Sequence, residues 1–272
     1  TNERVLKDEI KKYSIDELTK LSGEIREQLI DVVSENGGHL ASNLGVVELT
    51  LALHYVFNSS KDKFIWDVGH QAYVHKILSG RREALSTIRK YGGISGFPKC
   101  NESIDDCFDV GHSSTSVSAA LGLANARDLK GEKHSVLAII GDGAMTGGMA
   151  FEALNHAGHL QTDMTVILND NEMSISGNVG AMSTYLNKVR LDPNYTKRKQ
   201  YIENILNRIP KIGNKVAWTA EKIKDTVKYL MVPGQLFEEL GFRYFGPVDG
   251  HNLEELIDVL KKIQEIKGPK IV

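Results

Sequence analysis

Two short apolar runs constrain the fold of this chain more than any other feature. Residues 136–140 are followed directly by Gly-Asp-Gly, and residues 164–168 by Asn-Asp-Asn. A short apolar run that stops at small or acidic residues is typical of a buried parallel strand with a loop at its carboxyl end. Residues 149–159, between the runs, have the pattern of a crossover helix. The stretch therefore predicts a β-α-β unit, and open α/β sheets bind ligands at this edge.

The residues at the two strand ends have the chemistry of a metal and phosphate site. Asp142 offers an anionic oxygen and Asn171 a neutral carbonyl oxygen, which are ligands that Mg2+ uses together with water and phosphate oxygens. Gly141 and Gly143 would let backbone amides approach a diphosphate at the start of the next helix. From the residues alone, a pair of tight turns with no ligand is the alternative.

Two common nucleotide-binding motifs do not fit this stretch. A nicotinamide-cofactor loop needs a third glycine at the position of Thr146, and a Walker loop needs Gly-Lys followed by Ser or Thr, which is absent. A bare Gly-x-Gly after a strand is by itself a weak indication of any ligand.

Two histidines lie where binding residues gather. His39 is in a glycine-bounded loop, and His70 is at a strand-to-helix turn that follows residues 63–68. A single histidine is a weak indication of function, so packing or helix capping remains open for both. The glycine-rich segment 91–98 is expected near the mouth of the site or, equally, as a plain surface connection.

Gly111, His112 and Ser113 precede a helix rich in small residues. Amides and hydroxyls at a helix N-terminus suit an anion. Ordinary N-capping by Ser114 or Thr115 is the alternative that the residues leave open.

The scaffold shows local signals of its own. Ser14 and Glu17 form a capping box ahead of a helix, and residues 46–57 are expected as an amphipathic helix. Near the end of the chain we expect a strand around residues 243–245 and a last helix over residues 252–266.

Two long strings resemble a known enzyme family. They are Gly-Asp-Gly-Ala-Met-Thr-Gly-Gly-Met-Ala-Phe-Glu-Ala-Leu-Asn-His-Ala-Gly from Gly141 and Ile-Leu-Asn-Asp-Asn-Glu-Met-Ser-Ile-Ser from Ile167. Gly-Asp-Gly followed by Asn-Asp-Asn resembles the thiamine diphosphate motif, and the longer strings resemble the 1-deoxy-D-xylulose-5-phosphate synthases. The resemblance runs from about residue 34 to the last residue and is weakest across 184–230.

The resemblance implies a fold and an activity. The family has a doubly wound, mainly parallel α/β sheet with helices on both faces, in the thiamine diphosphate-binding fold. With thiamine diphosphate and Mg2+, the family condenses pyruvate with D-glyceraldehyde 3-phosphate to 1-deoxy-D-xylulose 5-phosphate and CO2, a transketolase-type transfer. The product feeds isoprenoid, thiamine and pyridoxal synthesis.

The resemblance also implies roles for individual residues. His39 and His70 would face the substrate and move protons, and His70 would also bind the cofactor. The expected metal ligands are Asp142, Asn171 and Met173, the last through its backbone carbonyl. The expected cofactor-binding residues are His70, Gly111, His112, Ser113, Gly143, Ala144 and Asn171.

One diphosphate-binding domain is expected over residues 1–272, with a basic helical excursion at about 184–230. The family's pyrimidine-binding and C-terminal domains are expected to be absent from this chain, which ends where a strand begins. We therefore expect a fragment that is inactive alone, needs a pyrimidine-binding domain and belongs to a homodimer. The alternatives are the N-terminal subunit of a split transketolase and a non-catalytic module that binds Mg2+ and a diphosphate.

Composition argues against several classes of partner. The net charge of −2 implies no bulk attraction to nucleic acid or a membrane surface. The basic segment 184–230 is interpreted as a solvated helical face, because no nucleic-acid motif accompanies it. No apolar run is long enough to span a bilayer. Cys100 and Cys107 fit neither a zinc motif nor a disulfide framework, so a cytoplasmic location is expected.

Overall fold

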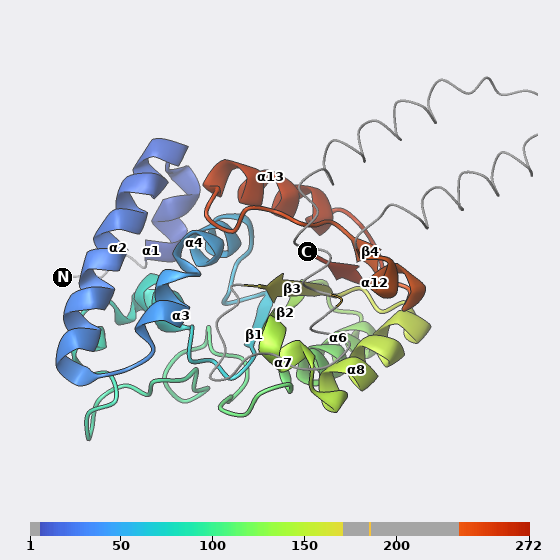
Figure 1. Cartoon of the computed structure of the whole chain (residues 1–272), viewed down its shortest axis with the longest axis horizontal. Helices are drawn as coiled ribbons and strands as arrows, with labels where there is room; N and C mark the ends of the chain where they lie inside the picture. Colours follow the sequence, from blue (N-terminus) through green and yellow to red (C-terminus); the bar gives the residue numbers. More distant parts are fainter. Residues whose placement is uncertain (1–5, 171–184, 186–233) are drawn as a thin grey trace, which may run out of the picture.

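A parallel sheet forms the centre of the described chain (Figure 1). The computed structural model describes residues 6–170, Tyr185 and residues 234–272. The five strands run in the order β1-β2-β3-β5-β4, and each neighbouring pair is parallel. Their bounds are Lys63–Trp66 for β1, Val136–Gly141 for β2, Thr165–Asn169 for β3, Arg243–Tyr244 for β4 and Lys270–Ile271 for β5. The predicted α/β fold with a mainly parallel sheet is confirmed.

Helices cover both faces of the sheet (Figure 1). The longer helices are α2 (Ile15–Asn36), α4 (Val47–Val56), α6 (Ser116–Lys130), α8 (Gly148–Leu160) and α13 (Leu253–Gln264). The shorter ones are α1 (Leu6–Glu9), α3 (Leu40–Leu44), α5 (Tyr73–Lys76), α7 (Asp142–Met145) and α12 (Gln235–Glu239). Single turns lie at Ile10–Lys12, Ile77–Arg81 and Ala84–Thr87. The predicted excursion at 184–230 lies outside the described residues except for Tyr185.

Alternate residues of the central strand β2 enter two separate cores. Leu137 and Ile139 pack in a cluster with side chains from α2, α4 and α13. Ala138 and Ile140 pack in a second cluster with side chains from α6 and α8. Because successive strand side chains point to opposite faces, a strand buried on both faces is apolar at every position, as this run is.

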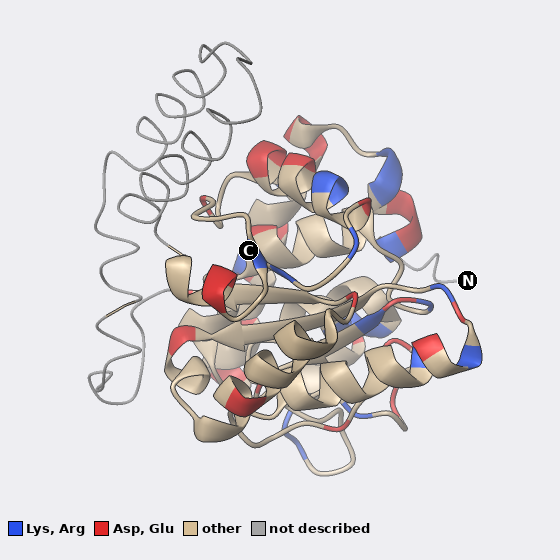
Figure 2. Ribbon diagram, turned by 90° about the vertical axis from the view of Figure 1, so that its right-hand side faces the viewer, with Lys and Arg blue, Asp and Glu red and all other residues tan. Residues whose placement is uncertain are grey.

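Charged side chains lie mainly on the outer helices and loops. In Figure 2, blue Lys and Arg and red Asp and Glu are spread over the outer helices of the visible face, while the sheet is mostly tan. Within the part of the chain that the structure describes, no helix is both long and apolar enough to cross a bilayer.

Helix α2 begins as the sequence predicts. The backbone N–H of Ser14 donates to Glu17 Oε2 at 2.7 Å, and the N–H of Glu17 donates to Ser14 Oγ at 3.3 Å. These reciprocal bonds satisfy two amides at the helix start that have no partner within the helix. The expected capping box is confirmed.

The expectation of an amphipathic helix over 46–57 is wrong. Residues 47–54 of α4 are all buried, because both α2 and α13 pack against this helix. The charged residue in this stretch, Glu48, accepts hydrogen bonds from Arg26 and from His251 Nδ1, the latter at 3.0 Å. Burial raises the pKa of the Glu48 carboxyl, but these hydrogen bonds outweigh burial and the net shift is downward.

The end of the described chain returns to the sheet. β4 and β5 pair in parallel, and β5 also pairs with β3. Helix α13 is capped by Asn252, whose Oδ1 accepts a hydrogen bond from the N–H of Glu255 at 3.1 Å. The predicted strand near residue 243 and the predicted last helix are confirmed. The pairing of β5 with β3 joins this last part of the described chain to the central sheet.

Helix α8 approaches the segment after α12 so closely that it leaves no room for a side chain. A Cβ atom at Gly158 would lie 1.6 Å from the carbonyl oxygen of Leu240. Gly122 in α6 offers a contrast, because a Cβ atom there would meet nothing within 4 Å.

Gly158→Ala is expected to lower the free energy of unfolding by at least about 2 kcal/mol, because the backbone of one segment must move. Gly122→Ala is expected to raise it by up to about 1 kcal/mol, because alanine is the better helix former. Urea unfolding of both variants measures the difference. Equal effects of the two substitutions would contradict the close contact.

Candidate active site

Polar residues follow the ends of three neighbouring strands. Trp66 of β1 lies opposite Ile139 of β2, and Gly141 of β2 lies opposite Asn169 of β3. Asp67 and Asp142 directly follow the first two of these strands and are both buried. The carboxyl edge predicted from the two apolar runs therefore exists and carries carboxylates.

The predicted metal set is only partly within the described residues. Asp142 begins α7, directly after β2. Asn171 and Met173 lie outside the described residues, just beyond the end of β3. The assignment of all three as magnesium ligands stays a prediction, and the anionic oxygen of Asp142 at this edge has the chemistry that Mg2+ prefers.

Asp67 fastens the start of helix α6 to the end of β1. Its Oδ1 accepts a hydrogen bond from the N–H of Ser114 at 2.7 Å, and its Oδ2 accepts one from the N–H of Ser116 at 3.0 Å. Thr115 is the N-cap residue but makes no side-chain capping bond. The alternative of N-capping by Ser114 or Thr115 is therefore wrong. The amides at the start of α6 are bound instead by the carboxylate of Asp67, which directly follows β1.

The loop before α6 lies against the turn that follows Asp142. Ser114 Oγ donates a hydrogen bond to the carbonyl oxygen of Ala144 at 2.8 Å. A Cβ atom at Gly147 would lie 2.2 Å from that hydroxyl oxygen. The two predicted diphosphate-binding segments therefore lie side by side at one edge of the sheet, residues 111–113 in the loop before α6 and residues 143–144 in α7.

His39 and His70 contact each other. Their ring centroids are 5.2 Å apart in an edge-to-face arrangement. His39 directly precedes α3, and His70 lies in the turn between β1 and α5. The structure thus brings together the two histidines that were predicted to act on the substrate, although their roles remain predictions.

Asn43 joins the backbones of these two histidines, and sequence reasoning missed it. Its Nδ2 donates to the carbonyl oxygens of His39 at 2.7 Å and His70 at 2.8 Å, and its Oδ1 accepts from the N–H of Tyr73 at 2.9 Å. The side chain is fully buried. An asparagine between two leucines in a short helix was the available signal, since a buried amide needs partners.

Both imidazoles are biased toward the neutral form. Burial is the main cause of the lowered pKa of His39, and the positive charge of Arg89 adds to it. Burial also lowers the pKa of His70, with the neighbouring His39 as the second cause. Two neutral imidazoles can accept protons near neutral pH.

Several buried polar atoms at this edge fit a bound ligand. Among the described residues, His70 Nδ1, Ser116 Oγ and Tyr73 Oη have no hydrogen-bond partner. Buried polar groups usually have partners, so these atoms indicate that a ligand or water completes them. A Cβ atom at Gly111 would meet nothing within 4 Å, which leaves open space beside the loop expected to bind the cofactor.

A cavity of about 470 Å³ opens beside His39. It is lined by His39, Tyr73 and much of the segment 89–102, including the glycine-rich loop. Part of the glycine-rich segment therefore lies beside His39, while residues 91–93 are exposed at the surface, and a role of the segment in the site stays a prediction.

Comparison with known proteins agrees with this geometry. The family model described as 1-deoxy-D-xylulose-5-phosphate synthase matches residues 3–272. The 1-deoxy-D-xylulose-5-phosphate synthase of Syntrophomonas wolfei is 66% identical over 261 residues, which are 96% of this chain and 41% of that protein. The chain belongs to the 1-deoxy-D-xylulose-5-phosphate synthase family. The family member from Carboxydothermus hydrogenoformans is 60% identical over 267 residues, 98% of this chain and 43% of its own length.

The solved structures extend the comparison to the fold. A transketolase structure from Campylobacter jejuni superposes with a TM-score of 0.66 at 22% identity, over 96% of this chain and 38% of that chain. At this identity the likeness concerns the fold alone. The chain spans about two fifths of the length of the curated family members it matches.

Asp67→Ala is expected to lower the free energy of unfolding by about 2 kcal/mol, because two buried amides at the start of α6 lose their acceptor. Asp67→Asn keeps one acceptor oxygen and is expected to lose less. Asp128→Ala, at the exposed end of the same helix, is the control and is expected to change stability by no more than about 0.5 kcal/mol. Thermal or urea unfolding compares the three variants. A loss in Asp67→Ala no larger than in the control would contradict the capping role.

Proposed function

We propose that this chain is the diphosphate-binding part of an enzyme that condenses pyruvate with D-glyceraldehyde 3-phosphate to 1-deoxy-D-xylulose 5-phosphate and CO2. The observation that carries the proposal is the contact between His39 and His70 beside the strand edge that holds Asp142. Membership of the synthase family over nearly the whole chain supports it.

Each residue at this edge has a proposed task. Asp142, Asn171 and Met173 would hold Mg2+, and Gly143 and Ala144 would contact the cofactor diphosphate. Gly111, His112 and Ser113, at the start of α6, would contact the same group. Bound thiamine diphosphate supplies the nucleophilic carbon and the electron sink that decarboxylation of pyruvate needs.

His39 and His70 would handle protons at the reacting end of the substrate. Their lowered pKa values favour neutral rings, which can accept a proton near pH 7. His70 Nδ1 is buried and has no hydrogen-bond partner among the described residues, so a bound ligand or water would complete it. Asn43 binds the backbone carbonyl oxygens of both histidines and so holds together the two segments that carry the rings.

The proposed enzyme needs more than this chain. Since the chain spans about two fifths of its relatives, a pyrimidine-binding domain and a C-terminal domain would complete the site. We propose a homodimer in the cytoplasm, whose product is a precursor for isoprenoid, thiamine and pyridoxal synthesis. Cys100 and Cys107 are both free thiols, as a reducing compartment would allow.

Thiamine diphosphate is expected to bind the chain in the presence of Mg2+ and to be released by a chelator. Asp142→Ala is expected to weaken this binding at least about tenfold, because the metal loses an anionic ligand. Isothermal titration with and without Mg2+ measures the change. Glu152→Gln, on the exposed side of α8, is the control and is expected to bind as the unchanged chain does.

The activity itself is tested by CO2 release from pyruvate, with thiamine diphosphate and Mg2+, in the presence and absence of D-glyceraldehyde 3-phosphate. The purified chain alone is expected to release none. The chain joined to the remaining domains of the Syntrophomonas wolfei relative is expected to release CO2, with stimulation by the aldehyde. Release by the chain alone would contradict the half-site, and a folded, cofactor-loaded assembly without release would contradict the synthase proposal.

A further inference from the structure

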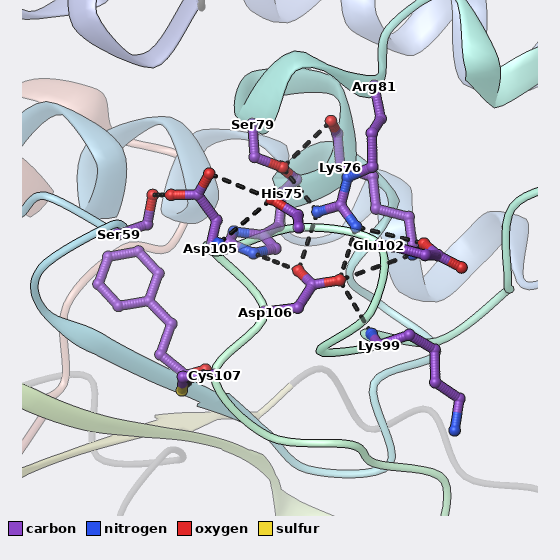
Figure 3. A network of polar contacts seen from close by, with 12 residues as sticks. Ser59, His75, Lys76, Ser79, Arg81, Lys99, Glu102, Asp105, Asp106 and Cys107 are labelled. Atoms are coloured by element: carbon purple, nitrogen blue, oxygen red, sulfur yellow. Dashed lines mark hydrogen bonds and ion pairs between the residues drawn. The ribbon is translucent and has the colours of Figure 1, made fainter.

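The loop of residues 93–99, here called the wall loop, lines the cavity and is fastened by two carboxylates. Glu102 Oε1 accepts a hydrogen bond from the backbone N–H of Ser95 at 2.7 Å. Asp106 Oδ2 accepts one from the backbone N–H of Lys99 at 2.9 Å (Figure 3). The wall loop is therefore held near both of its ends by acids that lie further along the chain.

The same carboxylates bind cations from α5 and the turn after it. Lys76 Nζ lies 2.5 Å from Glu102 Oε2. Arg81 donates to both oxygens of Asp106, at 2.6 and 2.8 Å, and His75 Nε2 lies 3.1 Å from Asp106 Oδ1 (Figure 3). The side chains of Lys76 and Asp106 are 0% exposed. The cluster thus bridges the wall loop and the helix that follows the second candidate catalytic histidine.

A cluster buried this deeply adds little net stability. Removing each ion from water costs several kcal/mol, and apolar side chains of similar size often stabilise a core as well. Burial raises the pKa of Asp106, but hydrogen bonds from Arg81 and His75 outweigh it and hold that pKa well below its usual range. What the cluster supplies is geometry, because the amides of the wall loop meet acceptors that are themselves fixed in place.

The wall loop touches both histidine segments. The ring of Phe97 lies 6.3 Å from the ring of His39, measured between centroids. A Cβ atom at Gly69, directly before His70, would lie 2.6 Å from Pro98 Cδ. Movement of the wall loop would therefore open the surroundings of both rings.

We propose that Glu102 and Asp106 are positioning residues, which hold the wall loop against His39 and His70 and so keep water from the candidate site. Both act through the wall loop, because their carboxylates accept hydrogen bonds from its backbone amides. The proposal deepens the proposed function and rests on it only for the activity measurement described below.

His39 reports the position of the wall loop. Its pKa is lowered mainly by burial and secondly by Arg89, so hydration of the ring raises it. Loss of the negative charge of Glu102 would by itself lower the pKa of His39, because a nearby anion favours the protonated imidazole. No variant substitutes the other cations at the cavity, Arg89, Lys90 and Lys99, or the neighbouring ring of His70. An upward shift therefore reports loop movement and not charge loss.

The first measurement is an NMR titration of the His39 ring proton in the whole 272-residue chain, with the signal assigned by its loss in His39→Asn. Glu102→Gln and Asp106→Asn are expected to raise the pKa of His39 toward its ordinary value. Asp105→Asn is the matched control, because Asp105 is also buried and pairs with Lys7. It is expected to lower stability and leave the His39 titration unchanged.

A second pair of variants leaves every charge in place. Ser95→Pro removes the amide hydrogen that Glu102 accepts together with the hydroxyl, whereas Ser95→Ala removes only the hydroxyl, which accepts a hydrogen bond of 3.1 Å from the N–H of Phe97. Both variants lose this hydroxyl, so the pKa of His39 is expected to rise more in Ser95→Pro than in Ser95→Ala, and the difference reports the bond to Glu102. This pair tests the proposal even where loss of a buried charge unfolds the chain.

The activity measurement uses the assembled synthase. Glu102→Gln is expected to lower kcat/KM by about tenfold or more, since a loosened site wall misplaces the reacting groups, while Asp105→Asn changes it less than about twofold. An unchanged or lowered pKa of His39 in both Glu102→Gln and Ser95→Pro would overturn the positioning role. An inactive but folded assembly without substitutions would overturn the proposed function alone, because the titration needs no turnover.

Discussion

The parallel pairing of β1, β2 and β3 is the constraint on which the candidate site depends. Neighbouring parallel strands end at the same edge, so the loops that follow them meet there even though long stretches of chain separate them. Burial on both faces fixes the register, because a slip of one residue would send the side chains of one core into the other. The positions of Asp67 and Asp142 follow from this register.

Buried carboxylates then connect the loops at this edge to the frame. Asp67 accepts hydrogen bonds from two amides at the start of α6. Asp106 accepts hydrogen bonds both from an amide of the wall loop and from the guanidinium of Arg81. Glu48 plays a related part behind the site, where it links α2 and α4 to His251. In each case a carboxylate joins segments that are distant in the sequence. These bonds give a site built on loops the rigidity that positioning requires.

The frame could be predicted from sequence where its signals are local. Strand runs, turns and the capping box depend on neighbouring residues, and the structure confirms them. The interpretation of α4 failed because the helix that covers it comes from the far end of the chain. Asp67 and Asn43 escaped notice because their partners become neighbours only in the folded chain. The family resemblance, and no local pattern, singled out His39 and His70, and their roles stay predictions as that of Asn171 does.

The contact between His39 and His70 limits the positive charge that the two rings can carry together. With the ring centroids 5.2 Å apart, charge on one ring disfavours charge on the other. A positive charge on His39 therefore lowers the pKa of His70 further than burial alone does. A proton on one ring therefore biases the other toward the neutral form, which is the form that accepts a proton. Two imidazoles in contact, with one asparagine bound to both backbones, thus disfavour a state in which both rings are charged.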